Sequence, residues 1–271
     1  MPLLPDFKTD ATDALCREIA KKSKGVCFLG FSRGKDSLYS WLFLLRYFKT
    51  VIPFHCASFP CLKHVKDTLD YYERQFDQKI LRLVGMELPS ALPRMFYQTA
   101  DDMDELEKLD TPNFSMLDIV DHLRYEMNLP KAWCAFGIMA NDSIDRRIYC
   151  NKVQGKNPQN LSFYPCWDHP RAEVLKGLRA SGLKLSGEYR WTSRTLGGVP
   201  SATCNAIYKR RYPEDWRRIL AMYPLAEAKT LRERYLDRIW ERRKADGIVH
   251  DDSAEAIAEE ESAADAMPEF E

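Results

Sequence analysis

The sequence predicts an α/β fold, a doubly wound and mostly parallel sheet with flanking helices, followed by a helical C-terminal region. Three observations predict it. Short apolar runs alternate with longer amphipathic runs through the first half of the chain, which is typical of strand–helix repeats. The apolar runs are nearly continuous, as in strands that are buried on both faces of a parallel sheet. A polar hexapeptide, residues 32–37, joins the first apolar run to a helix, and therefore occupies a tight strand-to-helix turn.

The first elements follow from the spacing of their apolar residues. Residues 7–22 carry apolar residues at the helical period, which predicts a helix. Residues 25–31, GVCFLGF, are short, apolar and bracketed by glycines, which predicts a buried strand. Apolar residues continue around the helical period over 38–47, and Asp36 with a serine near the cap is a normal helix start.

The same alternation continues downstream. Apolar runs predict strands over 50–59, 79–85 and 132–139, and amphipathic runs predict helices over 65–76 and 115–129. The later part of the chain is helical, with helices expected over 169–182, 213–224 and 225–247. Residues 86–130 depart from strict alternation and are acidic at 101–114, so we interpret them as an insertion or lid.

Charge is distributed unevenly along the chain. Nine of the 40 acidic residues and none of the 40 basic residues fall in 251–271, so the first 250 residues carry a formal charge of about +9. The acidic segment has few large apolar residues, and we expect it to be a disordered tail. No apolar stretch approaches the length of a membrane span, and MPLLPDFKTD lacks the pattern of a secretion signal. We therefore expect a cytoplasmic protein with no membrane partner.

The eight cysteines are scattered and form no C-x-x-C pair, so neither a zinc ribbon nor an iron–sulfur site is indicated. Cys27 and Cys134 lie in apolar runs and are expected to be buried thiols. No acidic residue lies at a spacing that would suggest a catalytic relay with His55 or His64, and we interpret both histidines as structural.

The hexapeptide Ser32-Arg33-Gly34-Lys35-Asp36-Ser37 has the composition of an anion site. At a strand-to-helix turn, unpaired backbone N–H groups and the positive end of the helix dipole point outward together. Gly34 permits close backbone approach, Lys35 adds a charge and the serines add hydroxyl donors. An ordinary capped loop is the alternative. A G-x-x-x-x-G-K-[ST] phosphate loop does not fit, because Asp36 follows the lysine and the glycine spacing differs.

This stretch resembles the S-G-G-K-D-S loop of the PP-loop ATP pyrophosphatase superfamily, which is adenine nucleotide alpha hydrolase-like. That superfamily includes phosphoadenylylsulfate (PAPS) reductases, ATP sulfurylase small subunits and tRNA-thiolating enzymes. The chain has Arg33 where the pattern has glycine. We expect this arginine to add another phosphate-seeking cation.

Three further stretches resemble the PAPS reductase-like branch, in the order in which that branch has them, and extend the similarity over 25–189. Phe59-Pro60 opens a helix, although Cys61 replaces the usual acidic residue. FGIMANDSIDRR is similar to G-I-R-x-x-x-S-x-x-R, with Met139 in place of the family's arginine. YPCWDHPRAEVLKGLRASGL matches a P-x-x-x-W region at Trp167, Val174 and Leu178, and Trp167 is equally compatible with core packing.

The resemblance implies an enzyme that binds ATP or a related adenine nucleotide with Mg²⁺ and splits ATP between the α and β phosphates to adenylate an acceptor. Lys35 and Asp36 would be catalytic, and Asp36 would hold Mg²⁺. The expected nucleotide-binding residues are Ser32, Arg33, Gly34, Lys35, Asp36, Ser37, Gly137, Ser143 and Arg146. Ser143 and Arg146 are also compatible with simply capping and decorating a helix.

Two other functions remain open. A thiol-dependent PAPS reductase forming sulfite would need a nucleophilic cysteine, for which Cys204 is the candidate because basic neighbours favour the thiolate. A non-catalytic nucleotide-binding module is favoured by Arg33 and Met139. We accordingly divide the chain into a nucleotide-binding α/β domain (1–190), a basic helical region (191–250) and the acidic tail (251–271). Self-association is left open.

The basic helical region suggests a nucleic-acid partner. Arginines there are interleaved with aromatic residues such as Tyr208, Trp216 and Tyr235, a combination suited to phosphate contact and base stacking. The basic residues are Lys209, Arg210, Arg211, Arg217, Arg218, Arg232, Arg234, Arg238, Arg242, Arg243 and Lys244. The alternative is a set of solvated helix faces with core aromatics, because acidic residues at i,i+4 spacing are also present.

Deletion of residues 251–271 is expected to leave the melting temperature nearly unchanged, because an acidic segment of this composition buries little apolar surface. If the basic region binds nucleic acid, the deletion should also strengthen that binding, and the affinity should fall steeply with salt. Thermal unfolding and a salt series of binding measurements check both statements. A large loss of melting temperature would show that the segment packs on the body of the protein.

Overall fold

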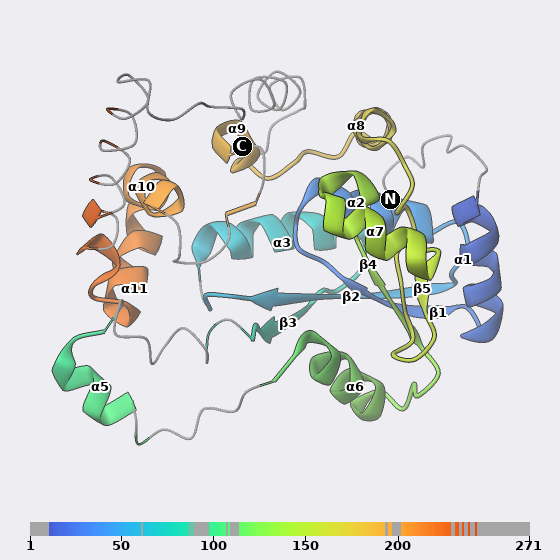
Figure 1. Cartoon of the computed structure of the whole chain (residues 1–271), viewed down its shortest axis with the longest axis horizontal. Coiled ribbons are helices and arrows are strands. Elements are labelled where there is room, and N and C mark those ends of the chain that lie inside the picture. Colours follow the sequence, from blue (N-terminus) through green and yellow to red (C-terminus); the bar gives the residue numbers. More distant parts are fainter. Residues whose placement is uncertain are drawn as a thin grey trace.

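A computed structural model describes residues 11–60, 62–86, 88, 98–106, 108, 114–192, 195–196, 202–228 and the single positions 231, 232, 235, 238 and 242. Within this part of the chain a six-stranded sheet has the order β3-β2-β1-β4-β6-β5 (Figure 1). The strands are β1 (Val26–Gly30), β2 (Thr50–Ala57), β3 (Leu81–Val84), β4 (Trp133–Phe136), β5 (Lys156–Asn157) and β6 (Ser162–Phe163). All neighbours pair in parallel except β5 and β6. The predicted fold class is confirmed.

Helices cover the faces of this sheet and also lie beyond the carboxyl ends of its strands (Figure 1). They are α1 (Ala11–Lys22), α2 (Lys35–Leu44), α3 (Lys63–Phe76), α5 (Ala100–Leu106), α6 (Met116–Glu126), α7 (Ile144–Val153), α8 (Arg171–Ser181), α9 (Tyr189–Thr192), α10 (Ala202–Arg211) and α11 (Pro213–Met222), with a 3-10 turn η1 (Ala140–Asp142). Among the described residues, no helix combines the length and the apolar character needed to cross a bilayer.

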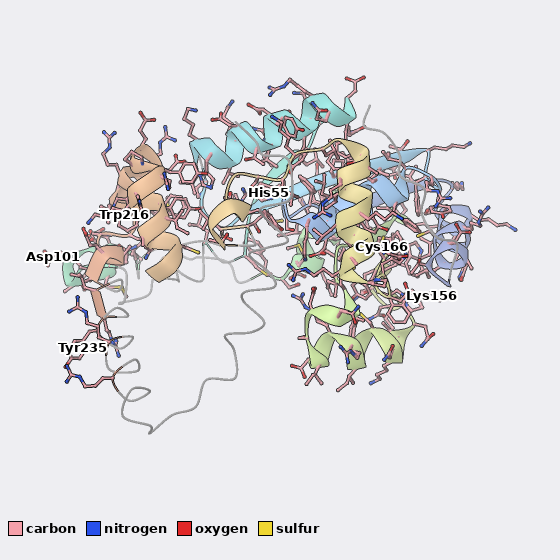
Figure 2. The ribbon with its side chains drawn as sticks, turned by 90° about the horizontal axis from the view of Figure 1, so that it is seen from above. His55, Asp101, Lys156, Cys166, Trp216 and Tyr235 are labelled. Carbon is pink, nitrogen blue, oxygen red and sulfur yellow. The ribbon has the colours of Figure 1, made fainter. Side chains whose placement is uncertain are left out.

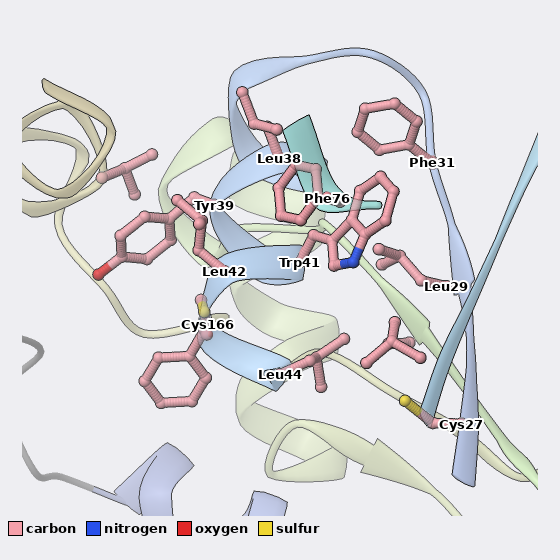
Figure 3. Close-up of a cluster of buried hydrophobic side chains, with 14 of the residues drawn as sticks. Cys27, Leu29, Phe31, Leu38, Tyr39, Trp41, Leu42, Leu44, Phe76 and Cys166 are labelled. Carbon is pink, nitrogen blue, oxygen red and sulfur yellow. The ribbon is translucent and has the colours of Figure 1, made fainter. Parts of the chain in front are cut away.

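Alternation along β1 divides the core into two layers. Cys27 and Leu29 face the larger layer, which is covered by α1, α2, α3 and α8, whereas Phe28 faces a second layer covered by α6. Figure 3 shows the larger layer around Trp41, whose ring stacks on Phe76 at a centroid distance of 3.9 Å. Burial on both faces explains why the strand sequences read as continuous apolar runs.

Helix α6 lies inside the segment that we interpreted as an insertion or lid. Its Val120 and Leu123 are buried against Phe28 and Ile52, so this part of residues 86–130 is the helix that covers the second face of the sheet. The lid interpretation is wrong for α6. The short strands β5 and β6 were not predicted from sequence, because each holds only two residues and shows no periodicity.

The C-terminal helices lie beyond the carboxyl ends of the strands (Figure 1). Helices α10 and α11 form a third apolar cluster in which Tyr208, Trp216 and Ile219 pack with Phe59 and Leu62, the residues that follow β2. This part of the chain therefore covers the sheet edge at which a doubly wound fold places its ligands. The expected helix over 225–247 lies largely outside the described residues, as do Cys61 and the tail, and the domain boundaries remain predictions.

Candidate functional site

The loop between β1 and α2 lies where the strand order reverses. Strands β2 and β3 follow on one side of β1, and β4 pairs on its other side, so the loop after β1 opens at a topological switch point. The N-cap of α2 is Gly34, and no side chain of that residue or of its described neighbours in the loop caps the helix. A helix N-terminus of this kind leaves backbone N–H groups available to an anion, and the anion site that the sequence predicts here stays a prediction.

Hydroxyl groups tie this loop together. The Ser37 Oγ donates to the Gly34 carbonyl oxygen at 3.0 Å, and the Gly34 N–H donates to the Ser32 Oγ at 3.3 Å. The two serine oxygens are 3.1 Å apart. These contacts fix the turn so that its backbone donors are already oriented before a ligand arrives.

Lys35 and Asp36 form a charge pair on the first turn of α2. The Lys35 Nζ lies 2.9 Å and 3.1 Å from the two Asp36 carboxylate oxygens, and both side chains are largely buried. Burial raises the pKa of Asp36, an effect that Lys35 opposes. Among the described residues no group of three or more His, Cys, Asp and Glu side chains could hold a metal. Asp36 alone suits Mg²⁺, which takes one or two carboxylates and completes its shell with phosphate oxygens and water.

Arg33 does not point at the anion site. Its backbone has φ = 66°, in the left-handed region that glycine favours, which accounts for the glycine of the family pattern at this position. Its guanidinium is buried and donates to the Glu188 Oε1 at 2.5 Å. The expectation that Arg33 adds a phosphate-seeking cation is therefore wrong in this structure, because Glu188 already neutralises the charge.

Glu188 continues into a buried network. Its Oε1 lies 3.2 Å from the His64 Nε2, and the His64 Nδ1 lies 2.9 Å from the Asp215 Oδ2. Burial would raise the pKa of Glu188, but Arg33 and His64 lower it to about 2. Burial also opposes ionisation of Asp215, whose pKa is nevertheless lowered to about 2 by hydrogen bonds from His64 and the backbone. The expectation that His64 lacks an acidic partner is wrong, because segments distant in sequence contribute Glu188 and Asp215, and its structural role stays a prediction.

Asp215 caps helix α3 from outside that helix. Its carboxylate accepts the backbone N–H groups of Lys63 at 2.7 Å and His64 at 3.0 Å. A negative charge at the positive end of a helix dipole is favourable, and the cap comes from α11. The loop, α3 and the C-terminal helices are therefore joined by one connected series of polar contacts, from Arg33 through Glu188 and His64 to Asp215.

The segment after β4 packs directly on the first turn of α2. A Cβ added to Gly137 would lie 2.5 Å from the Ser37 backbone nitrogen, so only glycine permits this approach. Met139, which replaces the family's arginine, is buried in the larger core layer. Ser143 is the N-cap of α7 and accepts the Arg146 N–H at 3.2 Å, and the Arg146 Nη1 donates to Asp142 at 2.5 Å. Nucleotide binding by Gly137, Ser143 and Arg146 stays a prediction.

A cavity of about 300 Å³ opens beside the loop at the carboxyl ends of β1, β2 and β4. Phe54, Phe136 and Met116 contribute apolar lining, and Leu196 and Tyr208 close it from the C-terminal side. The His55 Nδ1 lies 2.8 Å from the Phe31 carbonyl oxygen, which can only accept, so this nitrogen carries the proton. Burial, assisted by the charge on Arg33, lowers the pKa of His55 to about 4 and keeps the imidazole neutral at pH 7.

Several predicted contacts of the C-terminal half are not supported. Cys204 is buried in the apolar cluster of α10 and α11, which leaves it unsuited to act as the mobile thiol of a reductase. Tyr208 and Trp216 are core residues of the same cluster, so neither offers a face on the outer surface for stacking with the bases of a nucleic acid, whereas Tyr235 is exposed (Figure 2). Trp167 contacts Gly155 and packs against the larger core layer.

Two functional residues escaped sequence reasoning. Glu188 binds Arg33, and the hydroxyl of Tyr189 accepts the Lys35 backbone N–H at 2.7 Å. These contacts cross 155 and 154 residues of sequence. Local pattern analysis has no signal for such pairs, because neither residue belongs to a recognisable motif.

No protein-family model matches the chain, and no curated protein matches it. Among solved structures, it is similar to the NH3-dependent NAD synthetase from Campylobacter jejuni in complex with the nitrate ion, at 13% sequence identity and a TM-score of 0.41. The match covers 84% of this chain and 96% of that chain. Likeness at this level transfers neither ligand nor activity, and the site is interpreted from its own residues.

Replacing Gly137 with alanine is expected to abolish nucleotide binding, because the new methyl group would collide with the backbone of Ser37 and displace the loop. Gly182→Ala is the control for backbone strain alone: unlike Gly137, Gly182 has φ = 71°, which alanine disfavours, but its Cβ would meet no atom within 4 Å. This control should lower stability and leave ATP binding unchanged. Calorimetric titration with ATP and thermal unfolding of both variants check this. Wild-type affinity in Gly137→Ala would show that the close approach does not shape the site.

Arg33→Met and Glu188→Gln should each destabilise the protein, by about 3 kcal/mol or more for Arg33→Met, because a buried charge loses its partner. The double variant should lose less than the sum of the two single losses. Urea unfolding of all four proteins measures this coupling. Lys22→Met, which removes an exposed pair with Glu18, serves as the control and should change stability by less than about 1 kcal/mol. Additive losses would contradict a direct role for the pair.

Proposed function

We propose that this protein is a PP-loop enzyme that binds an adenine nucleotide, cleaves ATP between the α and β phosphates and adenylates an acceptor. The observation that carries the proposal is the N-terminus of α2. Its first-turn N–H groups and Lys35 meet at a topological switch point, next to an apolar cavity. A nucleotide needs both features, one for its phosphates and one for its base.

The two halves of the ligand have distinct places. The cavity of about 300 Å³, lined largely by apolar side chains, has the size and character of a small-ligand site and suits a flat base. Ser32 and Arg33 belong to its lining, so the cavity and the phosphate loop are continuous. A base in the cavity would direct its phosphates toward Gly34 and the first turn of α2.

The proposed reaction depends on stabilising the negative charge of the phosphates. An acceptor atom attacks the α-phosphorus, the bond from that phosphorus to the bridging oxygen breaks, and pyrophosphate leaves. Lys35 and the first-turn N–H groups stabilise the charge that develops on the leaving pyrophosphate. Mg²⁺, when bound, supplies further neutralisation of the phosphates, and Asp36 is the residue that would hold it. Lys35 would turn from Asp36 to the phosphates when it stabilises the leaving pyrophosphate.

The acceptor class is proposed from charge alone. Arg210 and Arg217 are exposed on α10 and α11, at the end of the molecule that closes the cavity, and they suit a nucleic-acid acceptor. Lys209 pairs with Glu227, and Arg218 donates to Asp215, so these two cations are partly neutralised within the protein. Sulfite formation is disfavoured because Cys204 is buried.

Lys35→Ala and Asp36→Asn are each expected to lower ATP turnover at least about 100-fold while leaving the fold intact, because both residues act on charge that develops in the transition state. The assay follows AMP transfer and pyrophosphate release from α-labelled ATP with Mg²⁺, with and without RNA or DNA. Lys22→Ala, at an exposed lysine on the last turn of α1 that pairs with Glu18, is the control. Wild-type turnover in either loop variant would remove that residue from the mechanism. Release of orthophosphate, or of sulfite from phosphoadenylylsulfate, would assign a different reaction.

A further inference from the structure

The hydroxyl of Tyr189 lies at the entrance of the phosphate loop. It accepts the Lys35 N–H at 2.7 Å, and a Cβ on Gly34 would lie 3.3 Å from it. Only 7% of the Tyr189 surface is exposed. The oxygen therefore sits at the first N–H group of α2, where a helix N-terminus binds anions.

The hydroxyl protons at this loop can be assigned one by one. Ser37 donates its proton to the Gly34 carbonyl oxygen, so the 3.1 Å contact between the serines uses the proton of Ser32. The contact between Tyr189 and Lys35 uses the amide proton, because an N–H group can only donate. Tyr189 thus retains its own proton, and within the described part of the chain the only hydrogen bond recorded for this hydroxyl is the one that it accepts.

A hydroxyl proton on a largely buried side chain is costly to leave without an acceptor, and the lack of one for Tyr189 among the described residues indicates an acceptor that a ligand supplies. Burial also raises the pKa of Tyr189, so the proton stays on the oxygen throughout the physiological range. The ring is held in place from the preceding residue. Glu188 is fixed by Arg33 and accepts the Leu196 N–H at 2.5 Å.

We propose that Tyr189 is a phosphate-binding residue, which donates its hydroxyl proton to an oxygen of the phosphate group bound at the loop. This inference rests on the proposed function, since it names a further contact of the same site. A bound phosphate would receive the Tyr189 O–H together with the N–H groups of Asp36 and Ser37, while Lys35 N–H continues to orient the phenol. A hydrogen bond to a charged oxygen is about twice as strong as a neutral one.

A second arrangement makes the opposite prediction. If the Tyr189 hydroxyl merely occupies the place of a phosphate oxygen, binding would have to displace it, and its removal would strengthen binding. The sign of the change in phosphate affinity on Tyr189→Phe therefore distinguishes the two arrangements. Weaker binding indicates that the hydroxyl donates to the phosphate, and tighter binding indicates that the hydroxyl competes with it.

The experiment measures binding of Mg-pyrophosphate, MgATP and adenosine to the full chain by calorimetry. Tyr189→Phe should weaken pyrophosphate and ATP binding about tenfold or more and leave adenosine affinity unchanged, because the lost donor touches only phosphate. Tyr71→Phe is the matched control, since its hydroxyl also accepts a backbone N–H, from Lys184 at 3.1 Å, and lies outside the loop. This control should bind all three ligands as the wild type does.

The outcomes test the proposed function and the role of Tyr189 separately. Failure of the wild-type protein to bind either ATP or pyrophosphate would overturn the proposed function itself. Binding by the wild type with equal or tighter binding by Tyr189→Phe would overturn the role of Tyr189 alone. Should Tyr189→Phe fail to fold, 3-fluorotyrosine introduced at position 189 keeps the shape and the hydroxyl. Its ¹⁹F signal should then shift on addition of Mg-pyrophosphate, and an unmoved signal would overturn the inference.

Discussion

The buried ion pair between Arg33 and Glu188 joins the loop between β1 and α2 to the second half of the chain, and the geometry of the candidate site depends on it. Both side chains are almost completely removed from water. Removing charges from water is expensive, so such a pair stabilises a fold only when its remaining hydrogen-bonding groups are also satisfied. Glu188 meets this condition, since it contacts Arg33, His64 and the backbone of Leu196. Arg33 meets it only in part, because its buried Nε has no hydrogen-bond partner among the described residues.

The same pair explains how an arginine can occupy a position suited to glycine. A residue with a Cβ in the left-handed region costs roughly 1–2 kcal/mol. The side chain that causes this cost also reaches Glu188, and a glycine there could not. In this chain the contact between Arg33 and Glu188 therefore holds the loop in its conformation. A glycine at this position would allow the same conformation but would not hold it.

A consequence is that the candidate site is composite. The loop after β1 supplies backbone donors and Lys35. Gly137, which follows β4, packs against the backbone at the start of α2. Glu188 and Tyr189 bind the loop from the C-terminal half of the chain. Asp215 extends the connection to α3 and α11. Because the C-terminal helices also close the cavity, binding of a nucleotide and packing of these helices are expected to stabilise each other.

Sequence alone determined the elements and the loop. The continuous apolar runs of β1, β2 and β4, the helical period of α2 and α3 and the polar hexapeptide are local patterns, and local patterns reflect burial and backbone geometry directly. The sequence placed Gly137 beside the loop, although its backbone approach to Ser37 could not be known, and nucleotide binding by Gly137 stays a prediction. Only the tertiary structure decided the direction of the Arg33 side chain and the acceptor of the Lys35 N–H group. It also decided that Cys204 and Trp216 are buried. Each depends on which distant segments meet, and the energy of those contacts is not encoded in the neighbouring residues.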